Sequence, residues 1–225
     1  SHPAGIFLKM NSKYPETFCY LFYTPQTGFW MGATPETLLA EKAGIIKTMA
    51  LAGTRPVSET NLPEKPWPEK EMQEQKFVAD YVHQELSRLG ITGIEISTPY
   101  TSQAGKIEHI RSDFVLSASV AGANTGEIIN ALHPTPAVCG IPKNAALQII
   151  NTTEGHHRDY YTGYLGPVNV NSETRLFVNL RCMKVHNSGF TIFAGGGITS
   201  ESHPDSEWNE TEMKVSVMKS ILMKD

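Results

Sequence analysis

The chain has 225 residues, of which 40% are hydrophobic, and carries 19 Lys and Arg residues against 23 Asp and Glu residues. This slightly negative balance excludes a general attraction to nucleic acid or to an anionic membrane, so we expect a small-molecule ligand held by local charges. The length is enough to bury a substantial core, and we interpret residues 1–225 as a single domain.

The sequence gives no sign of a membrane anchor or of an export signal. No apolar run reaches the roughly 20 residues of a spanning helix, and the N-terminus lacks a basic segment followed by an apolar one. The cysteines Cys19, Cys139 and Cys182 are too few and too dispersed for a disulfide framework or a cysteine zinc site. We therefore expect a cytoplasmic protein with reduced cysteines.

The first part of the chain has short apolar runs separated by turn residues, which is typical of antiparallel strands. The predicted strands cover residues 19–23, 29–31, 37–39 and 45–46. A proline-rich stretch from Pro56 to Pro68 predicts a loop. From Glu69, apolar residues recur at steps of three and four as far as Leu89, and Gly90 is a natural stop, so a helix is expected there.

The later elements are grouped rather than strictly alternating. We expect a strand over 114–120, helices over 126–132 and 144–150, a strand pair over 176–185 and 190–198, and a closing helix from about Asp205. This order favours an α+β fold, with mainly antiparallel sheets and helices packed outside them.

Acidic residues align with the apolar side of the closing helix. Glu207, Glu210 and Lys214 lie at positions i, i+3 and i+7, on a stripe that continues into Val217 and Ile221. This spacing predicts a face turned toward the protein whose first turns line a cleft. Alternatively, the acids form an exposed first turn that the helix dipole favours.

The earlier helix has a similar arrangement. Glu74 precedes Val78 by four residues and Tyr81 by seven, and Glu71 lies one turn further back. Acids from both helices could hold one hard cation such as Mg²⁺, which takes one or two protein carboxylates and leaves positions for an anionic substrate. The alternative for Glu71 and Glu74 is an ordinary solvated run.

A glycine triplet suggests a site for an anion. Gly195-Gly196-Gly197 follows a predicted strand and frees backbone N–H groups to approach a carboxylate, while Arg181, expected on the neighbouring strand, can grip one with two parallel hydrogen bonds. Arg181, the glycine amides, Lys214 and Mg²⁺ together would hold a dicarboxylate. Alternatively, the triplet is only a bulge or a turn.

Four segments carry a resemblance to a known family. They are GATPE at 32–36, ALAGTRP at 50–56, HPTPAVCGIPK at 133–143 and AGGGI at 194–198. With these motifs the chain resembles the chorismate-binding enzymes, which include isochorismate, anthranilate, aminodeoxychorismate and salicylate synthases. It is most similar to the isochorismate synthases, and the resemblance extends from about Tyr20 to the last helix. It implies an anthranilate synthase component I-like fold and chorismate as the substrate.

The resemblance also implies roles for individual residues. Glu36 would be the general acid that protonates the leaving C4 hydroxyl, although Thr34-Pro35-Glu36 could also simply open the strand that contains Leu38. The implied Mg²⁺ ligands are Glu74 and Glu210, with Glu71 and Glu207 beside them and bound directly or through water. The implied substrate-binding residues are Ala52, Gly53, Thr54, His133, Thr135, Tyr161, Arg181, Gly195, Gly196 and Lys214.

Ala52 distinguishes between branches of the family. The resembling aminodeoxychorismate synthases carry a lysine at this position, which attacks the ring and forms a covalent intermediate. Alanine has no nucleophile, so water must attack. This favours isochorismate synthase chemistry, in which water enters at C2 and the C4 hydroxyl leaves while Mg²⁺ and Glu36 stabilise the departing charge.

Several positions depart from the family's pattern or have two interpretations. Family members often have His where this chain has Gln75. His133 and Thr135 would shape the ring pocket or hydrogen-bond in it, but His133 could equally stabilise the turn before Pro134. His156 and His157 are adjacent and point apart, with no third soft ligand near them in sequence, so we interpret them as loop residues.

One catalytic group of the family has no counterpart here. In isochorismate synthases a lysine on a strand well upstream of the GATPE-like segment activates the water, and neither Lys9 nor Lys13 lies in that context. We therefore expect this chain to be the C-terminal portion of a longer catalytic domain, able to bind Mg²⁺ and carboxylates but to turn over chorismate poorly or not at all.

Three alternatives remain open from the sequence. The chain could belong to an anthranilate synthase, to a salicylate synthase that also releases pyruvate, or to a non-catalytic chorismate-binding domain. The full enzyme is expected to be a monomer without nucleic-acid or membrane partners, whereas the fragment could self-associate through unpaired strand edges. The sequence does not distinguish menaquinone from siderophore biosynthesis as the pathway.

Overall fold

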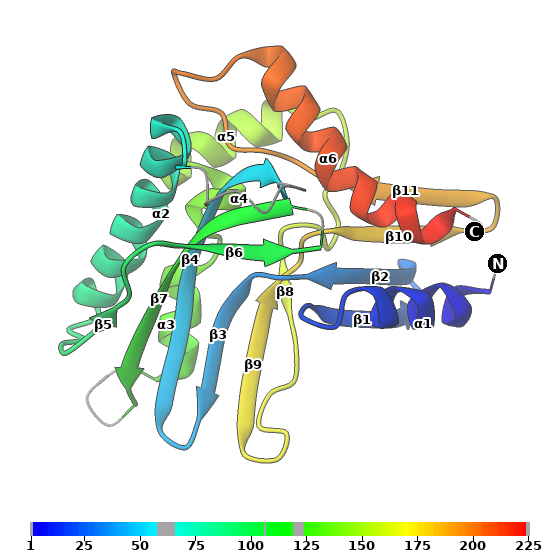
Figure 1. Ribbon diagram of the computed structural model, residues 1–225. Coiled ribbons are helices and arrows are strands. Elements are labelled where there is room, and N and C mark those ends of the chain that lie inside the picture. Colours follow the sequence, from blue (N-terminus) through cyan, green and yellow to red (C-terminus); the bar gives the residue numbers. More distant parts are fainter. Residues whose placement is uncertain (1, 58–65, 106, 119–123, 224–225) are drawn as a thin grey trace.

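The computed structural model describes residues 2–57, 66–105, 107–118 and 124–223 (Figure 1). Its six helices are α1 (Pro3–Lys13), α2 (Glu69–Arg88), α3 (Thr125–Leu132), α4 (Pro136–Cys139), α5 (Lys143–Thr153) and α6 (Pro204–Leu222) within these ranges. The strands there are β1 (Phe18–Thr24), β2 (Gly28–Thr34), β3 (Thr37–Lys42), β4 (Ile45–Pro56), β5 (Glu95–Ile96), β6 (Tyr100–Ala104), β7 (Ile107–Ser117), β8 (Tyr164–Leu165), β9 (Glu173–Val178), β10 (Cys182–His186) and β11 (Gly189–Phe193).

The strands form two antiparallel sheets. The four-stranded sheet has the order β1-β2-β10-β11, and the seven-stranded sheet has the order β5-β7-β4-β3-β9-β8, with β6 also paired to β7. The predicted α+β class with antiparallel sheets is therefore confirmed. No helix in the described ranges is long and apolar enough to cross a membrane.

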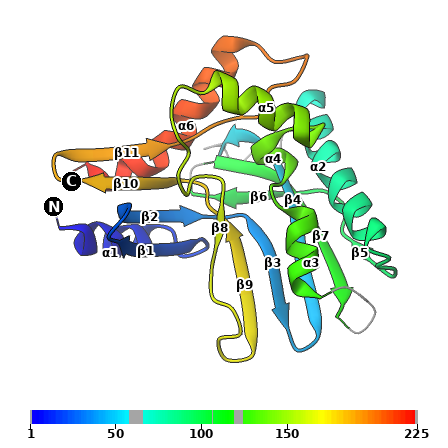
Figure 2. The same ribbon diagram turned by 180° about the vertical axis from the view of Figure 1, so that it is seen from behind.

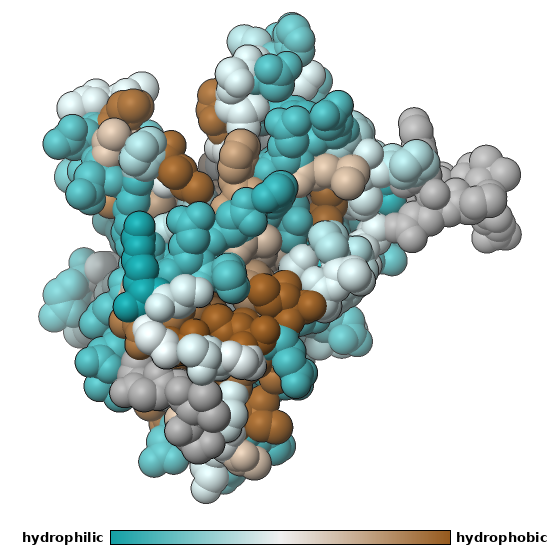
Figure 3. All heavy atoms as spheres, turned by 90° about the vertical axis from the view of Figure 1, so that its left-hand side faces the viewer, coloured by the Kyte–Doolittle hydropathy of each residue, from teal (hydrophilic) through white to brown (hydrophobic). Residues whose placement is uncertain are grey.

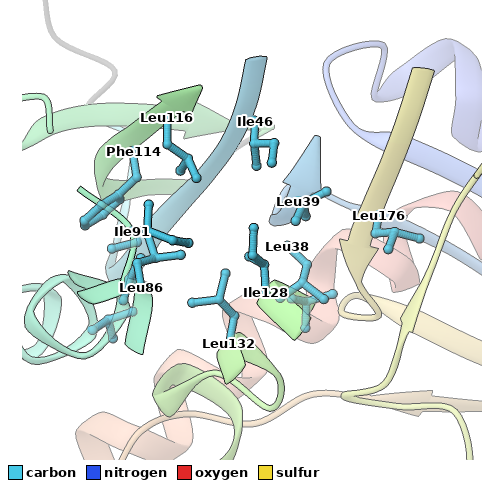
Figure 4. Close-up of a cluster of buried hydrophobic side chains, with 14 of the residues drawn as sticks. Leu38, Leu39, Ile46, Leu86, Ile91, Phe114, Leu116, Ile128, Leu132 and Leu176 are labelled. Atoms are coloured by element: carbon cyan, nitrogen blue, oxygen red, sulfur yellow. The ribbon is translucent and has the colours of Figure 1, made fainter. Parts of the chain in front are cut away.

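Helices α2 and α3 pack on one face of the seven-stranded sheet, as the rear view shows (Figure 2). Val78, Val82 and Leu86 of α2 recur at four-residue intervals and are all buried, which is the face that the sequence periodicity predicts. They meet residues of the sheet such as Phe114 (Figure 4). Burying each such side chain contributes about 1.5–3 kcal/mol, so this contact fixes the rotation of α2 and of the acids at its start.

Helices α1 and α6 cover the four-stranded sheet. Their buried side chains, including Met10 of α1 and Met218 of α6, pack on Met31 and Met183 of the sheet. The Tyr14 hydroxyl, just after α1, donates a 3.1 Å hydrogen bond to the Val217 carbonyl of α6. The two helices therefore lie side by side although they come from opposite ends of the described chain (Figure 1).

One predicted element is wrong. The sequence predicts a single strand over 176–185, but the chain leaves the seven-stranded sheet at Val178 and enters the four-stranded sheet at Cys182. Arg181 was expected on a strand. It lies instead in this crossing, with φ +48°. Strand periodicity does not reveal the break, because both halves are apolar and each is buried in its own sheet.

Other differences concern shorter elements. The sequence did not predict α1, α4 and the short strands β5, β6 and β8, and the strand expected over 190–198 ends at Phe193. The strand expected to start at Phe114 begins at Ile107. Residues 119–120 of that prediction, and most of the predicted loop from Pro56 to Pro68, lie outside the described residues.

An apolar groove runs between α2 and β6. Trp67, Met72, Ala79, Ile96 and Tyr100 contribute to its lining. Figure 3 shows the side of the molecule that carries α2, where hydrophobic side chains gather between polar ones. The groove shares no lining residue with the cavity that lies between the two sheets.

Candidate functional site

The two sheets are joined by two neighbouring crossings of the chain. Residues 35–36 lead from β2 to β3, and residues 179–181 lead from β9 to β10. The crossings are held together because Val178 N–H donates to the Glu36 carbonyl at 3.0 Å, and Ala33 N–H donates to the Arg181 carbonyl at 3.1 Å. Glu36 and Arg181 therefore start from fixed, adjacent backbone positions.

A cavity opens at these crossings, between the end of β4, the start of α2, the loop after β11 and α6. Ten of the predicted site residues line it: Glu36, Ala52, Gly53, Thr54, Glu74, Tyr161, Arg181, Gly195, Gly196 and Lys214. Five others, namely Glu71, His133, Thr135, Glu207 and Glu210, lie outside the lining. The structure thus gathers in one place residues that are up to 178 positions apart, from Glu36 to Lys214.

Glu36 is a buried carboxyl group at the cavity wall, only 3% exposed. Burial raises its pKa to about 7, although the Thr135 hydrogen bond and the charges of Lys214 and Arg181 oppose the rise. The Thr135 hydroxyl donates to Oε1 of Glu36 at 3.3 Å. Near neutral pH this group is therefore divided between its acid and its anion, which is the state that suits a proton donor.

Arg181 is a buried guanidinium group in the same cavity, 8% exposed. It forms no ion pair with a carboxylate anywhere in the described part of the chain, and burial lowers its pKa to about 10. A buried cation without a counter-ion is costly, and an anionic ligand would provide one. The planar guanidinium can meet a carboxylate with two parallel hydrogen bonds.

His109 on β7 lines the cavity but was not predicted from the sequence. Its Nδ1 lies 2.8 Å from the Gly53 carbonyl, which can only accept, so Nδ1 carries the proton and Nε2 accepts a hydrogen bond from Arg181. Burial and the Arg181 charge lower its pKa to about 3. In the sequence His109 lies two residues after Ile107, which is the spacing of side chains on one face of a strand. The strand was predicted to begin only at Phe114, so this spacing was not used.

The end of β4 brings Ala52, Gly53 and Thr54 to the cavity. The pairing of β4 with β7 shifts register between Ala52 and Arg55, and Gly53 has φ +70°. A Cβ atom on Gly53 would lie 3.0 Å from Cβ of Glu71, so glycine is needed both for conformation and for space. The Gly53 backbone also lies near enough to the Glu74 carboxyl group to lower its pKa, against the larger rise caused by burial. This bulge therefore packs directly against the start of α2.

The glycine triplet lies against four side chains that the sequence predicted as site residues. A Cβ atom on Gly195 would lie 2.9 Å from the Tyr161 hydroxyl oxygen, and one on Gly197 would lie 3.2 Å from Oε1 of Glu74. A Cβ atom on Gly196 would lie 3.5 Å from carboxylate oxygens of both Glu207 and Glu210. Lys214 donates to the Gly195 carbonyl at 3.0 Å. The triplet is thus a close approach of backbone to the site rather than a simple turn.

Acids from α2 and α6 converge behind this triplet. Burial raises the pKa of Glu74, and the negative charge of Glu210 raises it further. Lys70 pairs with Glu207 at 2.5 Å, and Lys214 pairs with Glu210 at 2.7 Å. Together with Glu71, the four carboxylates exceed the two ammonium groups by two negative charges when all are ionised.

The residues present suit a divalent cation. Oε2 of Glu71 and Oε2 of Glu207 are buried and have no hydrogen-bond partner among the described residues. Within those same ranges, no three His, Cys, Asp or Glu side chains are already arranged around one metal position. Mg²⁺ needs only one or two protein carboxylates and keeps water and substrate oxygens as its other ligands, so this donor set fits it.

His133 and Thr135 are placed away from the ligand space. The His133 ring packs edge-on against Tyr164 with centroids 4.9 Å apart, and burial lowers its pKa to about 4. The His133 carbonyl accepts a 2.8 Å hydrogen bond from Lys143. This arrangement matches the turn-stabilising alternative for His133, whereas Thr135 acts on the site through its bond to Glu36.

The cavity between the two sheets brings together a buried arginine, a carboxyl group with a pKa of about 7 and, beside them, a cluster of carboxylates. A family model described as "Chorismate binding enzyme" matches residues 1–223. The chain therefore belongs to the chorismate-binding enzyme family.

Named relatives include both isochorismate and anthranilate synthases. The chain is 32% identical over 220 residues to isochorismate synthase MenF of Haemophilus influenzae, covering 92% of this chain and 49% of the relative. It is 28% identical over 213 residues to anthranilate synthase component 1 of Saccharolobus solfataricus, covering 90% of this chain and 50% of the relative. The chain spans about half the length of the curated relatives it matches.

A solved structure shares the fold. The menaquinone-specific isochorismate synthase MenF of Escherichia coli superposes with a TM-score of 0.81 at 24% identity, over 98% of this chain and 52% of that one. The expected chorismate-binding fold is therefore confirmed.

Proposed function

We propose that this chain is part of an isochorismate synthase, which converts chorismate to isochorismate by adding water at C2 and releasing the C4 hydroxyl. The observation that carries the proposal is the pairing, in one cavity, of Arg181 and Glu36. Arg181 is buried without a carboxylate partner among the described residues, and burial raises the pKa of Glu36 to about 7. The first group suits an anionic substrate, and the second suits a proton donor to a leaving hydroxyl.

The substrate would be held through its two carboxylates. Arg181 would bind one of them through its guanidinium fork, with the Tyr161 hydroxyl and the backbone N–H groups of the glycine triplet close by. Lys214, fixed between the Gly195 carbonyl and Glu210, adds a positive charge at the same wall. Glu36, in its protonated form, would give its proton to the departing C4 oxygen.

Ala52 supports attack by water rather than by the protein. It lines the cavity beside Gly53 and offers only a methyl group, so it cannot form a covalent intermediate. His109 is held as a neutral imidazole between Gly53 and Arg181, with both ring nitrogens engaged.

We also propose that Glu74 and Glu210 hold Mg²⁺, with Glu71 and Glu207 bound to it directly or through water. Support comes from the unpartnered oxygens of Glu71 and Glu207 and from the mutual repulsion of Glu74 and Glu210. When bound, Mg²⁺ supplies positive charge that neutralises these acids and stabilises charge on the reacting ligand.

The group that activates water would lie outside this chain. The lysine that performs this role in isochorismate synthases has no counterpart in context here, and the chain covers about half of its relatives. We therefore propose that the 225-residue chain alone turns over chorismate poorly. A cytoplasmic location and a monomeric full enzyme also stay predictions.

The test is product analysis with the full-length protein. With chorismate and MgCl2 we expect isochorismate, no pyruvate, and no aminated aromatic product when ammonium is added. An aminated product would favour the anthranilate synthase alternative. The similarity to anthranilate synthase component 1 of Saccharolobus solfataricus is the reason to test for it. Pyruvate release would favour a salicylate synthase. Chorismate binding without any turnover would favour a non-catalytic domain.

A further inference from the structure

Asn179 is a buried residue in the crossing between β9 and β10, two positions before Arg181 and 2% exposed. Its N–H group donates to the Gly163 carbonyl at 2.7 Å, and its carbonyl accepts from the Thr162 N–H group at 2.9 Å. Its side-chain amide donates to the Tyr160 carbonyl at 2.7 Å. Three hydrogen bonds thus tie this one residue to the backbone around Tyr161, although Asn179 itself does not line the cavity.

A second buried residue fixes the orientation of this amide. The Tyr20 hydroxyl, from β1, donates to Oδ1 of Asn179 at 2.5 Å. Burial raises the pKa of Tyr20 far above its ordinary value, so the hydroxyl keeps its proton. Gly32 on β2 makes room for the ring, because a Cβ atom there would lie 2.8 Å from it. Turning the amide over would place Oδ1 against the Tyr160 carbonyl, so only one orientation satisfies both partners.

The segment held by Asn179 needs such support. Asp159 and Thr162 have φ values of +48° and +65°, which non-glycine residues adopt only when their surroundings hold them there. Between them, Tyr161 reaches the cavity, where its ring stacks on Phe193 with centroids 5.5 Å apart. Because Asn179 is joined to Arg181 through a single residue, it links the backbone of Tyr161 to that of Arg181.

We propose that Asn179 is a positioning residue that sets the distance between the Tyr161 hydroxyl and the Arg181 guanidinium, and that Tyr20 orients it. The inference rests on the proposed function, in which these two side chains bind a substrate carboxylate. A carboxylate that must meet two donors at once is sensitive to small errors in their separation, so loosening this link weakens substrate binding more than it slows the chemical step.

The test compares three variants of the full-length protein with wild type. Asn179→Asp keeps the shape but turns the donor to the Tyr160 carbonyl into an acceptor, and Tyr20→Phe removes only the hydroxyl. Thr48→Val is the matched control, because the Thr48 hydroxyl is buried and donates to the Leu38 carbonyl at 2.7 Å, between β3 and β4 and outside the cavity lining. The readouts are KM and kcat for chorismate, and hydrogen–deuterium exchange of peptides covering residues 159–164.

We expect KM to rise about tenfold in Asn179→Asp and about threefold in Tyr20→Phe, with kcat changed less than KM. Exchange over 159–164 should become faster in both variants, while Thr48→Val leaves both readouts at wild-type values. Faster exchange with unchanged KM would overturn the role in substrate binding, as would an equal rise of KM in Thr48→Val. If wild type does not turn over chorismate, the proposed function fails, whereas unchanged exchange in Asn179→Asp refutes the positioning role independently.

Discussion

Lys70 of α2 and Glu207 of α6, which are 137 residues apart in the chain, form an ion pair of 2.5 Å between Nζ and Oε1 that joins the two helices. The other oxygen of Glu207 is buried and has no partner among the described residues. Lys70 therefore neutralises part of the acidic cluster while leaving one oxygen of Glu207 available to a cation.

Replacing this lysine should destabilise the protein in a way that magnesium partly reverses. Lys70→Met leaves Glu207 buried without its counter-ion, and because Lys70 is about a quarter exposed we expect a loss of about 1–2 kcal/mol in the free energy of unfolding. Added MgCl2 should then raise the melting temperature more in the variant than in wild type. Lys76→Met, which breaks an exposed pair with Asp80, is the control and should behave like wild type.

Glu36→Gln should abolish most of the activity while leaving substrate binding intact. The amide keeps the shape of the side chain but cannot donate the carboxylic proton, so kcat should fall about 10²–10⁴-fold. In wild type the rate should decline as pH rises above about 7, because the carboxyl group loses its proton there. The measurement is steady-state kinetics across this pH range. A variant that kept the wild-type kcat would contradict the assignment of Glu36 as the proton donor.

The raised pKa of the Glu36 carboxyl group also predicts how the stability of the protein depends on pH. Its pKa is raised from 4.5 to about 7, so between these values the folded protein holds a proton that the unfolded chain has released. Stability is therefore lost as pH rises through this window, by up to about 3 kcal/mol. Denaturant unfolding of Glu36→Gln should lack this contribution. If the free energy of unfolding changed with pH in the same way in wild type and in Glu36→Gln, the Glu36 pKa would not be raised.

Gly197→Ala tests the close approach of the glycine triplet to the acids. The added methyl group would lie 3.2 Å from Oε1 of Glu74 and must displace it, so affinity for Mg²⁺ should fall about tenfold. Gly189→Ala, at the start of β11, meets no atom within 4 Å and is the control. Isothermal titration with MgCl2 measures both. Equal affinities for Mg²⁺ in the two variants would show that the glycine triplet has no effect on the metal site.

The sequence predicted the helices and strands whose residues repeat with a clear period. The apolar steps of α2 placed Glu74 one turn before the buried Val78, because a regular helix fixes which side chains share a face. The same logic aligned Glu207 with Val217 and Ile221 on α6. All three are buried, which favours the inward-facing interpretation of Glu207 over the exposed first turn. Motifs then supplied Glu36 and the glycine triplet, which periodicity alone does not identify.

What the sequence did not predict depends on contacts between distant segments. The break between β9 and β10 exists because two sheets share the chain there, and local propensity cannot show it. His109 was missed for a related reason, since its role comes from Gly53 and Arg181, which lie 56 and 72 residues away. The sequence left two roles open for His133, in the ring pocket or in the turn before Pro134. The structure packs its ring on Tyr164, outside the cavity lining, which matches the second role.

The measurement that tests the central claim most directly is titration of chorismate into the full-length Glu36→Gln protein, with and without MgCl2, compared with the same protein that also carries Arg181→Lys. We expect binding that requires MgCl2 and that weakens about 10-fold to 100-fold when the guanidinium fork is lost, with the matched exposed change Arg175→Lys having no effect. Chorismate affinity that is the same with and without MgCl2, and the same with Lys at position 181, would contradict the account.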